Sequence, residues 1–377
     1  MGGLLSATLI VRDESAVLGD CLASIDGIVD EVVVVDTGSV DDSVAIAERY
    51  GARVISHAWS GDFAEARNLA LDAASGDWIL YIDADECLAP TDRRTVEQLL
   101  RGADKTAFRV LLCPYVRSTP YFEYRIWRHD PRIRFRGQIH EKVTPAISEV
   151  AAADGRPIGD CDLLLTHVGY EGDQTHKHRR NLPLLRAQLA VEPENLFNLH
   201  HLARVLAGLG QADEAERVLT SAVELARQRP HDSLGVLAFT DLVRARRDRG
   251  VDVTDLLGEA RLRFPENKLL WWIEAAFHLS HERYGDALEL LDRLLAVDLA
   301  TLPAEGVSYD DRIFGEFTHE ARGACLFRLG RYADAAAAYG EAARLNPGAL
   351  SYRAKRDAAA GRARRESEQG RPDTSVL

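Results

Sequence analysis

Residues 78–82 constrain the fold more than any other stretch, because they form a continuous apolar run that leads directly into a group of acids. A strand that is covered on both faces, as in the parallel sheet of an α/β domain, has this unbroken run of aromatic and branched residues. The acids Asp83, Asp85 and Glu86 follow it, and ligands of open α/β sheets bind just beyond the C-terminal strand ends. Two acids in isolation would be more typical of a turn and a helix cap, so the neighbouring elements decide between these interpretations.

The segments before this strand have the same organisation. Apolar runs alternate with helical patterns, the former over 5–11, 31–36 and 53–57 and the latter over 15–25, 43–50 and 62–74. Strands and helices that alternate at this spacing predict a parallel sheet with right-handed crossover helices. The first strand leads into Arg12 and Glu14 and the second ends at Asp36, so polar side chains are expected to collect at one edge of the sheet.

Composition and length exclude several classes of protein. A chain of 377 residues is long enough for two domains, and its net charge of −13 argues against a nucleic-acid partner or an anionic membrane surface. No apolar run approaches the roughly 20 residues that cross a bilayer, and no basic segment precedes the first one, so we expect neither a membrane span nor a signal peptide. The five cysteines are scattered and form no C-x-x-C motif, which favours a cytoplasmic location.

From about residue 177 the apolar period changes to 3.6 and a helical motif repeats. Frames that begin at 196, 234, 268 and 316 place small, aromatic and proline residues where a tetratricopeptide repeat has them, most clearly Gly323, Tyr339 and Pro347. A repeat of this kind has about 34 residues. We therefore predict an α/β domain over 1–175, a helical solenoid over 176–360 and a disordered tail over 361–377, with an irregular helical bundle as the alternative for the middle part.

Glycine-rich phosphate loops do not follow the predicted strands. The sequence has neither G-x-G-x-x-G nor the lysine-containing G-x-x-x-x-G-K-[ST], which disfavours a dinucleotide cofactor or an ATP bound by a P-loop. Carboxylates at strand ends instead suit a divalent cation that is shared with substrate phosphates. Arg67 and Asn68 lie in the second turn of the helix that Asp62 opens, where they could turn donors toward a phosphate or ribose.

Four motifs in this order and spacing, over 9–14, 34–42, 66–68 and 82–86, resemble those of the family 2 glycosyltransferases, which have the GT-A fold. The segment 135–141 resembles the G-x-[IV]-H-E motif of a bacterial subgroup that joins the transferase to C-terminal tetratricopeptide repeats and includes peptide S-glycosyltransferases. The resemblance implies an α/β GT-A domain with a Rossmann-like mixed sheet, followed by an all-α solenoid of tetratricopeptide type. The chain differs from the family at Arg12 and Asp13, where Lys-Asn is commoner.

The resemblance also implies roles for single residues. The nucleotide-sugar donor would be bound by Val11, Arg12, Glu14, Asp36, Gly38, Arg67, Asn68, Asp83 and Ala84. Mn²⁺ or Mg²⁺ would be held by Asp85, with Asp83, His140 and His167 as further candidate ligands. Because family 2 enzymes invert the anomeric carbon, a general base must accept the acceptor's proton, and Glu141 and Glu86 are the candidates, with Glu141 favoured.

The implied reaction moves a hexose from a UDP-sugar or another nucleoside diphosphate sugar to a peptide, a protein side chain or a small molecule. UDP-glucose and UDP-N-acetylglucosamine are the first donors to test, and a homodimer is left open. Two other interpretations remain at this point: a sugar-activating nucleotidyltransferase, which would usually have a glycine-rich basic loop at the first strand, and a non-enzymatic adaptor whose repeats bind a peptide.

Overall fold

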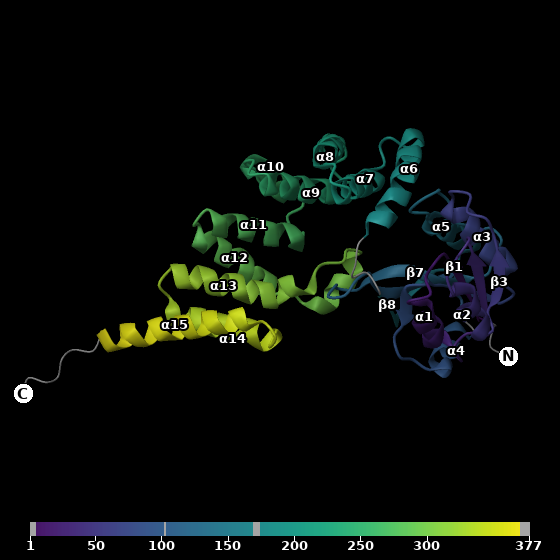
Figure 1. The fold of residues 1–377 in the computed structure, drawn as a ribbon, viewed down its shortest axis with the longest axis horizontal. Coiled ribbons are helices and arrows are strands. Elements are labelled where there is room, and N and C mark those ends of the chain that lie inside the picture. Colours follow the sequence, from purple (N-terminus) through teal and green to yellow (C-terminus); the bar gives the residue numbers. More distant parts are fainter. Residues whose placement is uncertain (1–4, 102, 169–173, 370–377) are drawn as a thin grey trace, which may run out of the picture. The chain divides into compact units, whose positions relative to one another are not determined.

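The computed structural model describes residues 5–101, 103–168 and 174–369, and the chain forms two compact units (Figure 1). The first unit comprises the described residues up to Val218 together with Ala300–Ser308, and the second comprises Leu219–Leu299 and the described residues from Tyr309 onward. Two helices beyond the predicted domain boundary at 175 thus belong to the same unit as the sheet. No helix among the described residues is long and apolar enough to span a membrane.

The first unit is built on a mixed sheet of eight strands in the order β3-β2-β1-β4-β7-β6-β8-β5. The strands are β1 (Leu5–Val11), β2 (Glu31–Asp36), β3 (Arg53–Ser56), β4 (Trp78–Tyr81), β5 (Glu86–Leu88), β6 (Ala107–Cys113), β7 (Tyr121–Arg128) and β8 (Ile158–His167). The first four are parallel, as the alternation of strands and helices predicts, whereas β7 runs antiparallel to β4. The predicted GT-A architecture with a mixed sheet is confirmed.

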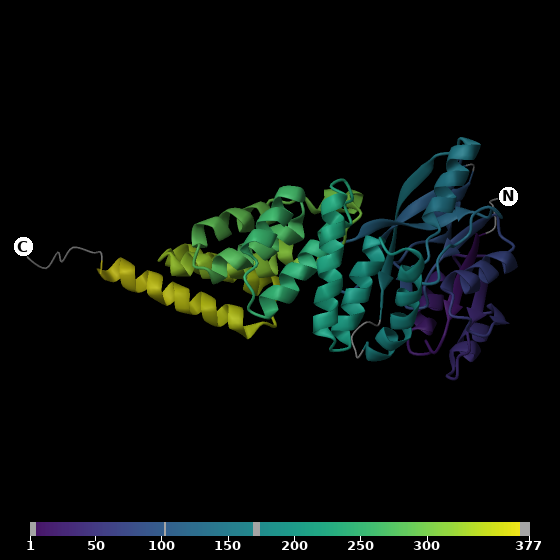
Figure 2. The ribbon, with the colours of Figure 1, turned by 90° about the horizontal axis from the view of Figure 1, so that it is seen from above.

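Helices cover both faces of this sheet (Figure 2). They are α1 (Leu18–Ile25), α2 (Ser43–Arg49), α3 (Phe63–Ala73), α4 (Arg93–Leu100) and α5 (Thr144–Asp154). Successive residues of a strand point to opposite faces, so Val34 and Leu80 pack in one apolar cluster with α1 and α4. Val35 and Ile79 pack in the other cluster with α3 and α5. Burial on both faces accounts for the unbroken apolar runs in β2 and β4.

The helices that follow the sheet begin close to the predicted starts of the repeat frames. They are α6 (Thr175–Val191), α7 (Leu196–Gly208), α8 (Ala212–Gln228), α9 (Gly235–Asp248), α10 (Thr254–Arg263), α11 (Lys268–Ser280), α12 (Tyr284–Leu295), α13 (Glu316–Arg328), α14 (Tyr332–Leu345) and α15 (Leu350–Gln369), with 3₁₀ helices over Leu299–Glu305 and Asp311–Phe314. The frames at 196, 234, 268 and 316 fall at the beginnings of α7, α9, α11 and α13, and α11 packs on α12 as α13 packs on α14. Of the segment predicted to be disordered, 361–369 is helical and 370–377 lies outside the described residues.

Replacing Gly323 by alanine is expected to lower the free energy of unfolding of the second unit by about 1–3 kcal/mol, the usual cost of overpacking. An added Cβ would lie 2.7 Å from ring atoms of Tyr339, so α13 and α14 could not keep their close approach. Gly258→Ala in α10 is the matched control: nothing lies within 4 Å of its Cβ position, and alanine should stabilise that helix by about 0.5–1 kcal/mol. Denaturant unfolding followed by circular dichroism measures both changes, and stabilisation by both substitutions would contradict the close packing.

Candidate active site

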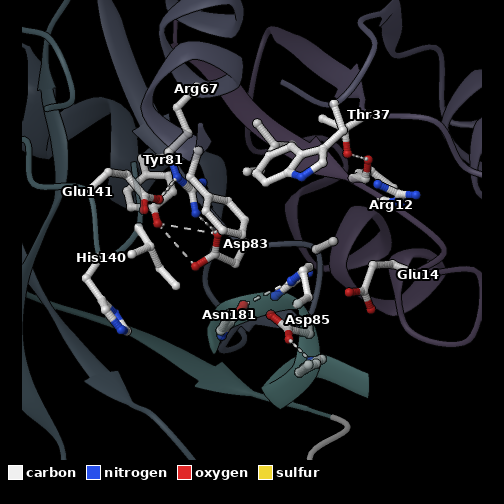
Figure 3. A pocket seen from close by; sticks show the side chains of 18 of the residues that line it. Arg12, Glu14, Thr37, Arg67, Tyr81, Asp83, Asp85, His140, Glu141 and Asn181 are labelled. Atoms are coloured by element: carbon white, nitrogen blue, oxygen red, sulfur yellow. Dashed lines mark hydrogen bonds and ion pairs between the residues drawn. The ribbon is translucent and has the colours of Figure 1, made fainter. Parts of the chain in front are cut away.

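A pocket of about 390 Å³ opens at the carboxyl ends of β1, β2 and β4 (Figure 3). Ten of the fourteen residues that the sequence predicts for the site line it: Val11, Arg12, Glu14, Arg67, Asp83, Ala84, Asp85, His140, Glu141 and His167. The parallel register explains the convergence. β1 and β2 end at the same level, because Val11 pairs with Asp36, whereas β4 ends earlier, at Tyr81 opposite Thr8, so the residues that follow Tyr81 run alongside the end of β1. The chain that follows each strand therefore meets the others above one edge of the sheet.

Arg67 links two of the acids that face the pocket. Its Nη2 lies 2.8 Å from Oδ1 of Asp83, its Nε donates to Oε1 of Glu141, and its side chain is almost fully buried. The side chain of Asp62 caps α3 by accepting from the Glu65 amide at 3.1 Å, which fixes the helix that carries Arg67. Burial would raise the pKa of Asp83, but the guanidinium of Arg67 and that of Arg125 outweigh it and lower the pKa to about 2. Asp83 is thus a carboxylate whose charge is already compensated by arginine.

Glu86 lies below the pocket and not in its lining. It is 2% exposed, its Oε1 accepts from Nη2 of Arg125 at 2.7 Å, and its Oε2 accepts from the Asp83 amide at 2.9 Å. Burial raises the pKa of Glu86 to about 7, although the charge of Arg125 acts in the opposite direction. Glu86 therefore shapes the turn that presents Asp83, and Glu141 is the candidate base that faces the pocket.

The carboxylate of Asp85 lies near a histidine and a lysine. Its Oδ2 is 3.1 Å from Nε2 of His167 and 3.8 Å from Nζ of Lys177. The pairing of β5 with β8 aligns Glu86 with His167 and brings that histidine beside Asp85. Burial raises the pKa of the nearby Glu14, and the charge of Asp85 adds to this rise. Within the part of the chain that the structure describes, no three His, Cys, Asp or Glu side chains gather closely enough to hold a metal without other ligands.

His140 lines the pocket, but its ring packs against a histidine of α7. The ring centroids of His140 and His201 are 4.0 Å apart, and His140 adopts a left-handed backbone conformation with φ of 54°. Burial, together with the neighbouring His200 and Lys142, lowers the pKa of His140 to about 4. Burial likewise lowers the pKa of His201 to about 2. Both imidazoles are therefore neutral near pH 7. His140 stays a prediction as a ligand of the cation, and so does His167, which lies beside Asp85.

The stability of the first unit is expected to fall as the pH drops from 6.5 toward 4, because the unfolded chain takes up protons that the folded histidine pair does not. Each group contributes at most about 1.4 kcal/mol per pH unit. His201→Phe keeps a ring in place and removes one titrating group, so it should flatten the pH dependence, whereas His176→Asn at an exposed position should not. Denaturant unfolding at pH 7.5, 6 and 5 measures this, and an unchanged slope in His201→Phe would count against the assignment.

Three predicted donor-binding residues support the pocket from behind its lining. The carboxylate of Asp36 accepts from the amides of Gly38 and Ser39 at 3.2 and 3.1 Å, so it closes the turn next to Thr37, which does line the pocket. Gly38 has φ of 103°, a conformation that glycine adopts without strain. The amide of Asn68 bonds both backbone groups of Phe135 at 3.0 and 2.9 Å. These contacts hold the loops in place, and the three remain predictions as direct ligands of the donor.

Nine further residues line the pocket that the sequence patterns did not predict, namely Ile10, Thr37, Trp59, Phe63, Tyr81, Ile139, Lys177, Arg180 and Asn181. Trp59 and Phe63 form an edge-to-face pair with centroids 4.7 Å apart, and their position on either side of a helix start was an available signal. The ring of Tyr81 lies between the guanidinium groups of Arg67 and Arg125, at 4.4 and 4.3 Å. The three lining residues of α6, Lys177, Arg180 and Asn181, could not be predicted from the sequence. Tertiary packing alone sets the distance of this helix from the ends of the strands.

Comparison with known proteins identifies the class of enzyme. Residues 6–152 match the glycosyl transferase family 2, and residues 317–349 match a tetratricopeptide repeat. A TPR repeat-containing protein of Synechococcus elongatus is 32% identical over 74% of this chain and 71% of its own length. The SPbeta prophage-derived glycosyltransferase SunS of Bacillus subtilis is 26% identical over 58% of this chain and 53% of its own length.

The chain belongs to the family 2 glycosyltransferases, in the subgroup that carries C-terminal tetratricopeptide repeats. It is a glycosyltransferase, which excludes the adaptor interpretation. Among solved structures, a glucosyl-3-phosphoglycerate synthase from Mycobacterium tuberculosis, in complex with Mn²⁺, UDP and glucosyl-3-phosphoglycerate, is 19% identical. That match covers 50% of this chain and 80% of the other, with a TM-score of 0.35.

Proposed function

We propose that the enzyme transfers a hexose from a nucleoside diphosphate sugar, first of all a UDP-sugar, to an acceptor with inversion and with the help of Mn²⁺ or Mg²⁺. The observation that supports this most directly is the charge of the pocket. Its lining holds four carboxylates, Glu14, Asp83, Asp85 and Glu141, and four Lys or Arg side chains, Arg12, Arg67, Lys177 and Arg180. These charges cancel, so a diphosphate that enters with about two negative charges needs a divalent cation to accompany it.

Asp85 and His167 would hold the cation. A carboxylate oxygen and an imidazole nitrogen are ligands that Mn²⁺ accepts, and the two side chains already meet at 3.1 Å at the rim of the pocket. Since the described residues bring no third His, Cys, Asp or Glu close enough to these two, the remaining positions would be filled by phosphate oxygens of the donor and by water, as is usual for Mg²⁺ sites. When bound, the cation supplies a Lewis acid that stabilises negative charge on the diphosphate.

The reaction breaks the bond between the anomeric carbon and the diphosphate oxygen, whose electron pair stays with the leaving group. The acceptor's oxygen or sulfur forms the new bond to the anomeric carbon from the opposite face, and its proton passes to a general base. Glu141 is our candidate for that base, since it lines the pocket and Arg67 holds its carboxylate in position. Arg67 also holds Asp83, which would approach the ribose or the cation. Trp59 and Phe63 offer an apolar wall against which a base or sugar face can pack.

We propose a peptide or protein side chain as the acceptor, because stacked helical repeats form extended surfaces that suit an extended partner. Small-molecule acceptors are the alternative, and a homodimer stays a prediction.

Calorimetric titration with UDP-glucose, UDP-N-acetylglucosamine and GDP-mannose, each with Mn²⁺ and with a chelator, tests the donor and the cation together. We expect one donor to bind with Mn²⁺ and to bind much more weakly once the metal is chelated. Equal affinity in chelator would exclude the cation, and absence of binding for all three would exclude the proposed donors. Release of diphosphate from UTP and a sugar phosphate would instead favour the nucleotidyltransferase interpretation.

A further inference from the structure

We propose that Lys177 and Arg180 of helix α6 bind the diphosphate of the donor and stabilise it as it leaves, so that α6 forms part of the active site. This inference rests on the proposed function. Helix α6 begins at Thr175, whereas the segment that matches the glycosyltransferase family ends at residue 152. The two cations therefore come from a part of the chain that the family match does not include.

The spacing of the residues on α6 explains why they reach the pocket together. Residues three and four apart lie on the same face of a helix, and Lys177, Arg180 and Asn181 all line the pocket. Asn181 marks the place of α6 in the pocket wall (Figure 3). The Nε of Arg180 donates to the Oδ1 of Asn181 at 3.0 Å, and its guanidinium lies over the ring of Phe63 at 5.2 Å. These contacts direct the charged end of Arg180 along the pocket wall formed by α3.

The electrostatic environment shows which groups the two cations face. Nζ of Lys177 lies 3.8 Å from Oδ2 of Asp85, and the lysine side chain is 30% exposed. The charges of Lys177 and Arg180 both lower the pKa of Glu14 against the effects of burial and of Asp85. The positive charges of Lys177 and Arg180 thus compensate the negative charges of Asp85 and Glu14. A divalent cation at Asp85 would take over that compensation and leave the ammonium and guanidinium groups to the phosphates.

The chemistry of the leaving group suits these two side chains. As the glycosidic bond breaks, its electron pair raises the negative charge on the phosphate oxygen, and donors that are already in place stabilise that charge. Charge-assisted hydrogen bonds from lysine and arginine to phosphate are about twice as strong as neutral ones. Because the charge grows during the reaction, both donor affinity and turnover should depend on Lys177 and Arg180.

The test compares Lys177→Gln, Arg180→Gln and the double variant with the wild type by calorimetric titration of UDP and UMP in the presence of Mn²⁺. We expect each single substitution to weaken UDP binding about 10- to 100-fold, with a smaller loss for UMP, and Lys177→Arg to recover most of the affinity. Arg179→Gln is the matched control, because Arg179 is exposed on the same helix and does not line the pocket. Thermal unfolding of each variant confirms that α6 is still folded.

The outcomes separate this inference from the proposed function. If the wild type binds UDP and the double variant binds it equally well, the role of α6 is wrong while the donor assignment stands. An equal loss for UDP and UMP, or a loss of the same size in Arg179→Gln, also overturns the assignment to the diphosphate. If the wild type does not bind UDP with Mn²⁺, the proposed UDP-sugar donor fails, and the inference about α6 fails with it.

Discussion

Asp85→Asn is expected to reduce turnover by about 10²- to 10³-fold, the range measured when one group that stabilises charge in a transition state is removed. The substitution keeps the shape of the side chain but removes the negative charge that lies 3.1 Å from His167 at the rim of the pocket. A neutral amide binds a hard divalent cation much more weakly than a carboxylate does. The apparent affinity for Mn²⁺ should therefore fall together with turnover, and product formation at increasing Mn²⁺ concentrations measures both.

Asp104→Asn provides the matched control for this experiment. The Asp104 side chain is 86% exposed and lies 3.5 Å from Arg156 at the surface, so its loss should leave turnover within a factor of two. Full activity of Asp85→Asn with the metal chelated would show that the strand-end acids do not act through a cation. That result would also remove the reason for placing the diphosphate at this edge of the sheet.

Arg67→Met is expected to lower the free energy of unfolding of the first unit by about 3–5 kcal/mol, which is typical when one partner of a buried ion pair is removed. Arg67 is 8% exposed and contacts two carboxylates, at 2.8 Å from Asp83 and through Nε with Glu141. Methionine fills most of the volume of the arginine side chain but leaves both carboxylates without its positive charge. Denaturant unfolding measures the loss, and catalytic activity should disappear because Asp83 and Glu141 lose their common support.

Two further variants distinguish the charge effect from a packing effect. Arg67→Met combined with Glu141→Gln removes one of the stranded charges and should recover part of the stability, whereas Arg134→Met, which breaks a pair with Asp72 at the surface, should cost less than about 1 kcal/mol. A loss in Arg67→Met no larger than in Arg134→Met would show that the buried network does not stabilise the fold.

The parallel half of the sheet and the convergence of its strand ends could be predicted from the sequence because both follow from local patterns. Unbroken apolar runs identify buried strands, and acids such as Asp85 directly after them fall at one edge. The repeat frames were equally accessible, since the small, aromatic and proline positions of a repeat, such as Gly323, Tyr339 and Pro347, mark where its helices begin. What local patterns could not decide was the side to which each acid of the 83–86 turn points.

Glu86 illustrates this limit. Its distance from Asp85 along the chain is one residue, but its orientation depends on the pairing of β5 with the distant strand β8 and on the buried partner Arg125. Lys177 and Arg180 show the same limit of local patterns, because a charged side chain on a helix is more often exposed to solvent than part of a binding site. Only the packing of α6 in the first unit shows that their side chains line the pocket.

The segment Ala300–Ser308 belongs to the first unit, although the chain has by then traversed much of the second. Its anchoring contact is a hydrogen bond of 2.7 Å from the hydroxyl of Ser308 to the carbonyl of Thr119. Domains emerging from the ribosome generally fold in the order of their synthesis, but here the N-terminal unit cannot be completed until residue 308 has been translated. The maturation of the transferase unit during translation is thereby tied to the synthesis of most of the helices that follow it.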